Sequence, residues 1–261
     1  MHPRSRGIAT GKPAVGQALS LVVAVLAWAM PALGQQPLQR QYRLEDCDKR
    51  MLAKVQVRPR WLPPNAIALG VPPDATTTAA EIAVLLTLQA TRTQADIAKI
   101  KAEAGDLVAP MLALLGTMPA HKPKTAALLR MAISDLEFFL FREKLALLRL
   151  RPHQVDARLR PAIAVPRHPA FPSGHGGTAL ALALLLAELH PQSRDTLLAF
   201  AQQVGWRREL AGVHFPSDTE DGRRIGAQVV AQLLATPEFA VLMLDAKVEW
   251  PPTAASRSQS Q

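Results

Sequence analysis

The sequence contains few of the residues that build disulfides, thiolate clusters and β-sheets. Cys47 is the only cysteine among 261 residues, which excludes an internal disulfide and a thiolate metal cluster. Aromatic residues make up only 5% of the chain, whereas alanine and leucine are abundant. Strands favour aromatic and β-branched side chains, while alanine and leucine favour helices. The composition therefore predicts an all-α fold, a single-domain multi-helix bundle.

The N-terminal segment lacks acidic residues and has the order of a signal peptide. Residues 1–12 are basic, residues 14–29 are almost wholly apolar, and the small residues Ala32 and Gly34 follow at typical cleavage positions. We therefore expect residues 1–34 to be removed and the mature chain to be periplasmic or secreted. Stable membrane insertion is not expected after cleavage, because no other stretch is long enough to span a bilayer. An uncleaved anchor is the alternative.

Basic residues exceed acidic ones. The formal net charge is +9, and removal of the signal segment takes away three cations and no acid, which leaves +6. Such a surface attracts anions, including phosphorylated small molecules and lipids. Nucleic acid is not expected as a partner, because the basic residues are interleaved with acids and lack aromatic stacking platforms.

The rest of the chain divides into an arm, one helical domain and a tail. Residues 35–76 are rich in proline and predict an N-terminal arm, and residues 249–261 predict a disordered tail. Residues 77–248 form the predicted helical domain. Thr78 and Glu81 have capping-box spacing and begin a helix expected to run to about residue 104. Further helical patterns cover residues 107–115, 124–150, 176–189, 193–204 and 217–234.

Two segments predict an anion site. Lys144 and Arg151 are seven residues apart, about two helical turns, so we expect both cations on one face of one helix. The turn of Ser173, Gly174 and His175 precedes an apolar helix, and free backbone N–H groups at such a turn bind anions. The alternatives are a basic helix C-terminus and an ordinary serine-capped helix beside an exposed histidine.

A third segment contains Arg208, His214 and Asp218. Pro216 marks the first turn of a helix, so His214 lies just outside a helix N-terminus, where a phosphate attached to its ring meets the positive end of the dipole. Asp218 is expected to reach the other ring nitrogen and to fix the tautomer. The alternative is a helix-capping aspartate with an incidental histidine.

Together the patterns Lys-x6-Arg-Pro, Pro-Ser-Gly-His and Arg-x5-His-x3-Asp resemble the signature of the type-2 phosphatidic-acid phosphatase superfamily, most closely the bacterial class A, non-specific, acid phosphatases. The resemblance covers residues 144–218 and implies the helical acid phosphatase/vanadium haloperoxidase fold. It also implies a metal-independent phosphatase that hydrolyses phosphomonoesters through a phosphohistidine intermediate, with broad specificity.

The resemblance implies a role for each motif residue. His214 is the nucleophile, Asp218 orients it, and His175 protonates the leaving group and later activates water. The implied phosphate-binding residues are Lys144, Arg151, Ser173, Gly174 and Arg208. No metal or other cofactor is implied, and vanadate is expected to inhibit as a phosphate mimic. A homo-oligomer is compatible with the resemblance.

One position departs from the family pattern, since Arg207 stands where the third motif usually has serine. Either the missing hydroxyl weakens a hydrogen bond, or the added charge favours a different substrate. His168 precedes the anion turn and is expected to be a surface residue, with contact to the substrate as the alternative. Other functions that stay open are a lipid-phosphate or isoprenoid-diphosphate phosphatase, a vanadate-dependent haloperoxidase and an inactive anion-binding module.

Overall fold

The structure is a computed structural model that describes residues 41–251, and within them every regular element is a helix. The predicted all-α class is therefore confirmed. The predicted signal peptide, residues 1–34, and residues 252–261 of the predicted tail lie outside the described residues.

The helices follow one another along the chain, and two of the connections are long, residues 54–74 before α2 and residues 156–173 before α7. In order they are η1 (Leu44–Asp46), α1 (Lys49–Ala53), α2 (Ala75–Thr91), α3 (Gln94–Ala102), α4 (Val108–Ala113), α5 (Pro123–Leu147), α6 (Pro152–Val155), α7 (Gly174–Leu189), η2 (Pro191–Ser193), α8 (Arg194–Leu210), α9 (Pro216–Leu234) and α10 (Pro237–Lys247).

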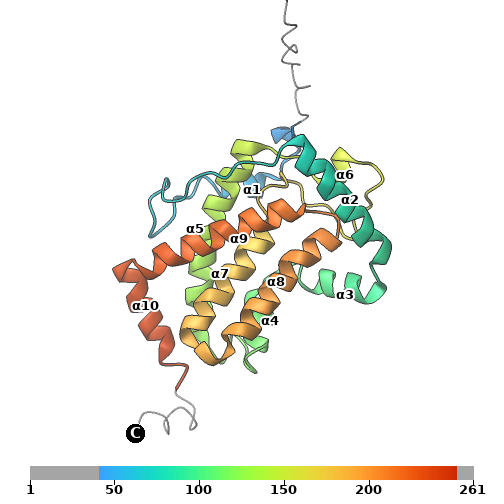
Figure 1. Cartoon of the computed structure of the whole chain (residues 1–261). Coiled ribbons are helices and arrows are strands. Elements are labelled where there is room, and N and C mark those ends of the chain that lie inside the picture. Colours follow the sequence, from blue (N-terminus) through green and yellow to red (C-terminus); the bar gives the residue numbers. More distant parts are fainter. Residues whose placement is uncertain (1–40, 252–261) are drawn as a thin grey trace, which may run out of the picture. The chain divides into compact units, whose positions relative to one another are not determined.

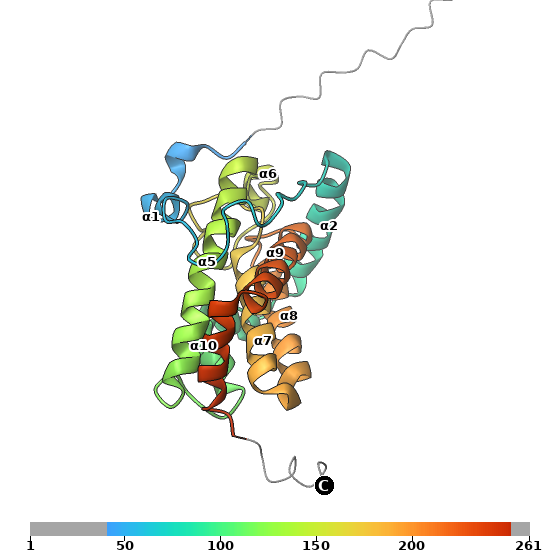
Figure 2. The same ribbon diagram turned by 90° about the vertical axis from the view of Figure 1, so that its left-hand side faces the viewer.

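Helix α7 lies at the centre of the bundle, between α5 and α8, and α9 packs across it (Figure 1). Its sequence is apolar around the whole circumference, which is the pattern of a helix that is buried on all sides. The view turned by 90° shows α10 beside α5 (Figure 2). Within residues 41–251 no single helix has both the length and the apolarity to cross a membrane, although α9 and α10 pass that test as a pair bent by 90°.

Three glycines allow α9 to approach α7 closely. A Cβ atom added to Gly226 would lie 2.5 Å from the Gly177 carbonyl oxygen, and one added to Gly177 would lie 2.7 Å from the Gly222 carbonyl oxygen. A Cβ atom on Gly222 would overlap the carbonyl oxygen of Ser173. The absence of side chains at these positions therefore brings the start of α9 against the N-terminus of α7, where two of the sequence motifs lie.

The predicted single helix over residues 78–104 is wrong, because the chain breaks between α2 and α3. Arg92 is extended, and Thr93 caps α3 through a capping box with Asp96. The N-cap of α2 is Asp74, whose side chain accepts a hydrogen bond from the Thr77 N–H at 2.7 Å. Thr78 and Glu81 consequently form no capping box, and their side chains are free to bind elsewhere.

The described part of the proline-rich arm packs against α5. The carboxylate of Asp135 accepts the backbone N–H of Arg60 at 2.7 Å and that of Trp61 at 3.0 Å. Leu62 enters the main hydrophobic core, and the ring of Trp61 meets that of Phe239 edge to face at 5.3 Å. These contacts order the arm along the helix that leads to the site.

Candidate active site

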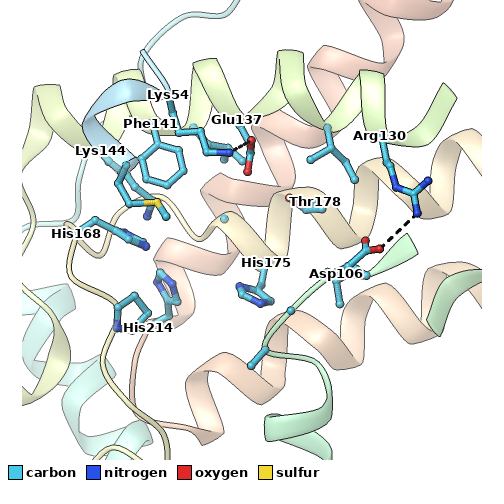
Figure 3. A pocket seen from close by; sticks show the side chains of 18 residues that line it. Lys54, Asp106, Arg130, Glu137, Phe141, Lys144, His168, His175, Thr178 and His214 are labelled. Atoms are coloured by element: carbon cyan, nitrogen blue, oxygen red, sulfur yellow. Dashed lines mark hydrogen bonds and ion pairs between the residues drawn. The ribbon is translucent and has the colours of Figure 1, made fainter. Parts of the chain in front are cut away.

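The three sequence motifs meet at one cavity of about 520 Å³. The first comes from the end of α5 and the turn after it, and the second from the N-terminus of α7. The third runs from the end of α8 through the following loop to the first turn of α9. Lys144, Gly174, His175 and His214 line the cavity, and Figure 3 shows both histidines at the same end of it. Arg151, Ser173, Arg208 and Asp218 lie behind this lining and are all buried.

The hydrogen bonds of His214 define its tautomer. Its Nδ1 lies 3.1 Å from Asp218 Oδ2, and its Nε2 lies 3.0 Å from Arg151 Nη1. A guanidinium only donates, so Nε2 accepts through its lone pair and the ring proton is on Nδ1, where the carboxylate accepts it. Burial, together with the charge of Arg151, lowers the pKa of His214 well below its usual range. The ring is therefore neutral and presents a nucleophilic Nε2.

Lys144 and Arg151 do not share a helix face, so that prediction is wrong. Helix α5 ends at Leu147, and Leu148 adopts a left-handed conformation with φ of 50°, which turns the chain away from the helix axis. Arg151 is instead the N-cap of α6. The turn nevertheless brings Arg151 to His214, because its guanidinium also donates to the carbonyl oxygens of Val213 at 2.7 Å and His168 at 3.0 Å.

Lys144 is fully buried and holds the segment that leads into the anion turn. Its Nζ donates to the carbonyl oxygens of Pro169 at 3.1 Å, Ala170 at 3.0 Å and Pro172. Burial, with the nearby Arg151, lowers the pKa of Lys144, and the three carbonyl acceptors oppose that shift because only the ammonium form has three donors. Lys144 thus contributes both positive charge and the position of the turn.

The anion turn connects α7 to the loop that bears His214. The Ser173 N–H donates to the Asp218 carbonyl oxygen at 2.7 Å, and its hydroxyl oxygen caps α7 by accepting the Gly176 N–H at 3.2 Å. Gly174 begins the helix and faces the cavity. The first backbone N–H groups of a helix have no partner within it, so they can bind an anion there.

His175 points from α7 toward the segment after α3. Its Nε2 lies 3.1 Å from the carbonyl oxygen of Glu103, so this nitrogen carries the proton. Burial, followed by the charge of Arg208, lowers the pKa of His175 to about 4. A phosphate in the cavity would add negative charge beside the ring and raise that pKa.

Arg207 and Arg208 share the carboxylate of Glu103. Arg207 donates to both of its oxygens, at 2.7 and 2.5 Å, while Arg208 lies 3.5 Å from Oε2 and donates to the Ile100 carbonyl oxygen at 2.9 Å. The buried Nε of Arg208 has no partner among the described residues. Arg208 therefore has a free donor, whereas the charge of Arg207 is neutralised by Glu103.

The sequence motifs gave no role to three residues of this region, Glu81, Glu103 and Arg149, and favoured a surface position for a fourth, His168. His168 is half-buried rather than on the surface: it lines the cavity and its Nδ1 lies 2.9 Å from Arg151 Nη2. Glu103 binds the arginine pair described above, and Arg149 and Glu81 lie behind Asp218. The position of His168 just before the anion turn had indicated substrate contact as the alternative, but no local pattern connects Glu81 or Glu103 to residues more than 60 positions away.

Beyond His175 the cavity extends between α5 and the segment before α4. Its walls are apolar at Ile133 and Leu140, and two ion pairs face it, Lys54 with Glu137 and Arg130 with Asp106 (Figure 3). Among residues 41–251 no group of three or more His, Cys, Asp or Glu side chains has a metal-binding arrangement.

Comparison with known proteins gives consistent matches. Residues 124–240 match the family model of the PAP2 superfamily. The non-specific acid phosphatase of Providencia stuartii is 35% identical over 81 residues, which cover 31% of this chain and 33% of that protein. The non-specific acid phosphatase of Salmonella typhimurium is 36% identical over 70 residues, which cover 27% and 28% of the two chains. The matches thus span about a third of these relatives.

Two solved structures are similar at low sequence identity. A bacterial vanadium-dependent iodoperoxidase has a TM-score of 0.49 and 15% identity, covering 70% of this chain and 53% of its own. A transmembrane PAP2-type phosphatidylglycerolphosphate phosphatase from Bacillus subtilis has a TM-score of 0.46 and 18% identity, covering 61% and 85%.

Proposed function

Because residues 124–240 belong to the PAP2 superfamily, close to the class A acid phosphatases, we propose that the chain is a phosphatase that hydrolyses phosphomonoesters through a phosphohistidine intermediate. The observation that carries the proposal is the state of His214. This ring is neutral, is anchored at Nδ1 by Asp218, and has the lone pair of Nε2 beside a guanidinium at the end of a cavity. That arrangement suits nucleophilic attack on a phosphoryl group.

In the first step the phosphoryl group occupies the space between His214 and His175. The Nη1–H group of Arg151, which donates to His214 Nε2 in the empty site, donates to a phosphoryl oxygen instead. The unpartnered Nε–H of Arg208 and the Gly174 N–H donate to the other phosphoryl oxygens. The Nε2 lone pair then forms a P–N bond as the ester P–O bond breaks, and the leaving oxygen takes a proton from His175.

In the second step water replaces the leaving alcohol. His175, now neutral, accepts a proton from the water as its oxygen attacks phosphorus. The P–N bond breaks, its electron pair returns to Nε2 of His214, and inorganic phosphate leaves. Asp218 stabilises the positive charge that the His214 ring carries in the intermediate. The buried cations Lys144, Arg151 and Arg208 supply the positive charge that phosphoryl transfer requires, so the mechanism needs no metal.

The part of the cavity between α5 and the segment before α4 receives the leaving group. Its apolar walls at Ile133 and Leu140 accept different alcohols without a specific hydrogen bond, which supports broad specificity. Export to the periplasm or outside the cell stays a prediction, because it rests on residues 1–34, outside the described residues.

Phosphate release from p-nitrophenyl phosphate, measured from pH 4 to 9 with EDTA present, tests the proposal. The wild type is expected to be active in EDTA, and the His214→Ala variant is expected to lose activity while it keeps the wild-type circular dichroism spectrum. Activity that EDTA abolishes would contradict the metal-independent mechanism. A parallel assay with a micellar lipid phosphate decides between a broad phosphomonoesterase and a lipid-phosphate phosphatase.

A further inference from the structure

Arg149 lies behind the His214–Asp218 pair and connects it to a helix outside the matched family region. Its side chain is 9% exposed. Nη1 donates to Asp218 Oδ1 at 2.6 Å and to the Ser217 hydroxyl oxygen at 2.8 Å. Nη2 donates to Glu81 Oε2 at 2.9 Å and to the Thr78 hydroxyl oxygen at 3.2 Å. The planar guanidinium group of Arg149 therefore binds two carboxylates, Asp218 through Nη1 and Glu81 through Nη2.

These contacts fix both oxygens of Asp218. Oδ2 accepts the Phe215 N–H at 2.9 Å and faces His214 Nδ1, while Oδ1 accepts from Arg149. A carboxylate bound at both oxygens cannot rotate, so the acceptor for the His214 proton stays in place. Burial raises the pKa of Asp218, and the positive charge of Arg149 opposes this shift most strongly. Without that charge, a fully buried carboxyl group would gain a proton at a higher pH.

Glu81, on α2, holds Arg149 in this position. Its Oε2 accepts from Arg149, and its Oε1 accepts the backbone N–H of Ser217 at 2.6 Å, in the first turn of α9. The guanidinium also stacks over the Phe215 ring, with its carbon 4.0 Å from the ring centroid. Thr78 and Glu81, whose spacing resembles a capping box, are thus both partners of Arg149, and they come from outside residues 124–240.

We propose that Arg149 is a positioning residue for the reaction: it orients Asp218 and keeps it ionised, and Glu81 on α2 holds it there. This role rests on the proposed function of His214 as the nucleophile. The charged and titratable groups around Asp218, which lies in the first turn of α9, are Lys144 from α5, Arg149 and Arg151 from the turn after α5, Glu209 from α8, Glu81 from α2 through Arg149, and His214 from the loop before α9.

Arg149→Gln and Arg149→Lys test the proposal, with Arg224→Gln as the matched control. Arg224 also binds two carboxylates, Asp221 at 2.6 Å and Glu143 at 3.3 Å, but none of these residues touches the cavity. Two readouts are needed. One is the pH profile of phosphate release, and the other is the ring N–H resonance of His214 in the substrate-free protein, observed by NMR.

The Arg149→Gln variant is expected to lose about 10- to 100-fold in kcat. The acid limb of its pH profile of phosphate release is expected to move up by about one to three pH units, because Asp218 then takes up a proton at a higher pH. The His214 resonance should shift or broaden. Arg149→Lys keeps a cation beside Asp218, so the acid limb should stay near that of the wild type, while the rate falls because lysine lacks the fork that spans two carboxylates. Arg224→Gln should change neither readout.

A folded Arg149→Gln variant with the wild-type acid limb and the wild-type His214 resonance would overturn the proposal and leave Arg149 a structural ion pair. If that variant does not fold, Arg149→Lys decides, since an unchanged rate in it would equally overturn the proposal. If the wild type releases no phosphate, the proposed function fails, but the His214 resonance still tests whether Arg149 controls the position of Asp218.

Discussion

Arg207 is predicted to act through Glu103 rather than by binding phosphate. Its guanidinium makes two hydrogen bonds to that carboxylate, at 2.7 and 2.5 Å, and its side chain is only 10% exposed. In an Arg207→Ser variant, Glu103 loses this partner. Its nearest remaining cation is Arg208, which is already 3.5 Å away and which is expected to bind the phosphoryl oxygens.

The magnitude follows from that rearrangement. A hydrogen bond to a charged group contributes about 1.5 to 3 kcal/mol, and phosphate must break it to reach Arg208. Since about 1.4 kcal/mol corresponds to a tenfold change in an equilibrium constant, KM should rise about 10- to 100-fold, whereas kcat changes little. The loss of one partner of a buried ion pair should also lower the free energy of unfolding, by at most about 3 to 5 kcal/mol.

The assay is steady-state hydrolysis of p-nitrophenyl phosphate by Arg207→Ser, by Glu103→Gln and by the double variant. The double variant should recover a KM near that of the wild type, because a neutral glutamine no longer competes for Arg208. Thermal unfolding separates the stability effect from the effect on binding. A wild-type KM in Arg207→Ser, or a double variant with the same raised KM, would contradict the role of Arg207 in keeping Glu103 away from Arg208.

Three further outcomes are expected. Burial lowers the pKa of His175 in the empty cavity to about 4, so kcat/KM should fall as the pH rises above that value. In a pH–rate series, His175→Asn should no longer show this fall, and its rate should be about 10²- to 10⁴-fold lower than that of the wild type. Gly222→Ala places a methyl group against the Ser173 carbonyl oxygen and should lower the free energy of unfolding by about 1 to 3 kcal/mol, while Gly105→Ala, which meets nothing within 4 Å, should not. Vanadate should inhibit competitively, and calorimetry should show weaker vanadate binding by His214→Ala.

The sequence motifs predicted the contacts of His214 better than the residues that support Asp218 and Arg208. The spacing of His214, Pro216 and Asp218 predicted a helix start and a ring–carboxylate contact, and both are present because they depend on one helical turn. The position of Arg151 could not be predicted in the same way. It depends on the left-handed backbone conformation of Leu148, which leucine rarely adopts and which no sequence pattern predicts.

The supports of Asp218 and Arg208 were missed for a different reason. Thr78 and Glu81 satisfied the rule for a capping box, but Asp74 caps that helix and the two side chains bind Arg149 instead. Capping rules consider only hydrogen bonds between residues a few positions apart, whereas Glu81 and Glu103 bind arginines that are distant in sequence. Only the packing of α2 and α3 onto α8 shows where these carboxylates lie.

The most direct test of the central claim is to trap the phosphorylated enzyme. Wild-type protein and His214→Ala would be mixed with a substrate labelled in its phosphate, quenched within one turnover under alkaline conditions that preserve phosphohistidine, and digested for peptide mapping. The phosphohistidine mechanism requires label on the peptide that contains His214 in the wild type and no labelled peptide in the variant. Turnover by the wild type with no labelled peptide, or with label on another residue, would contradict it.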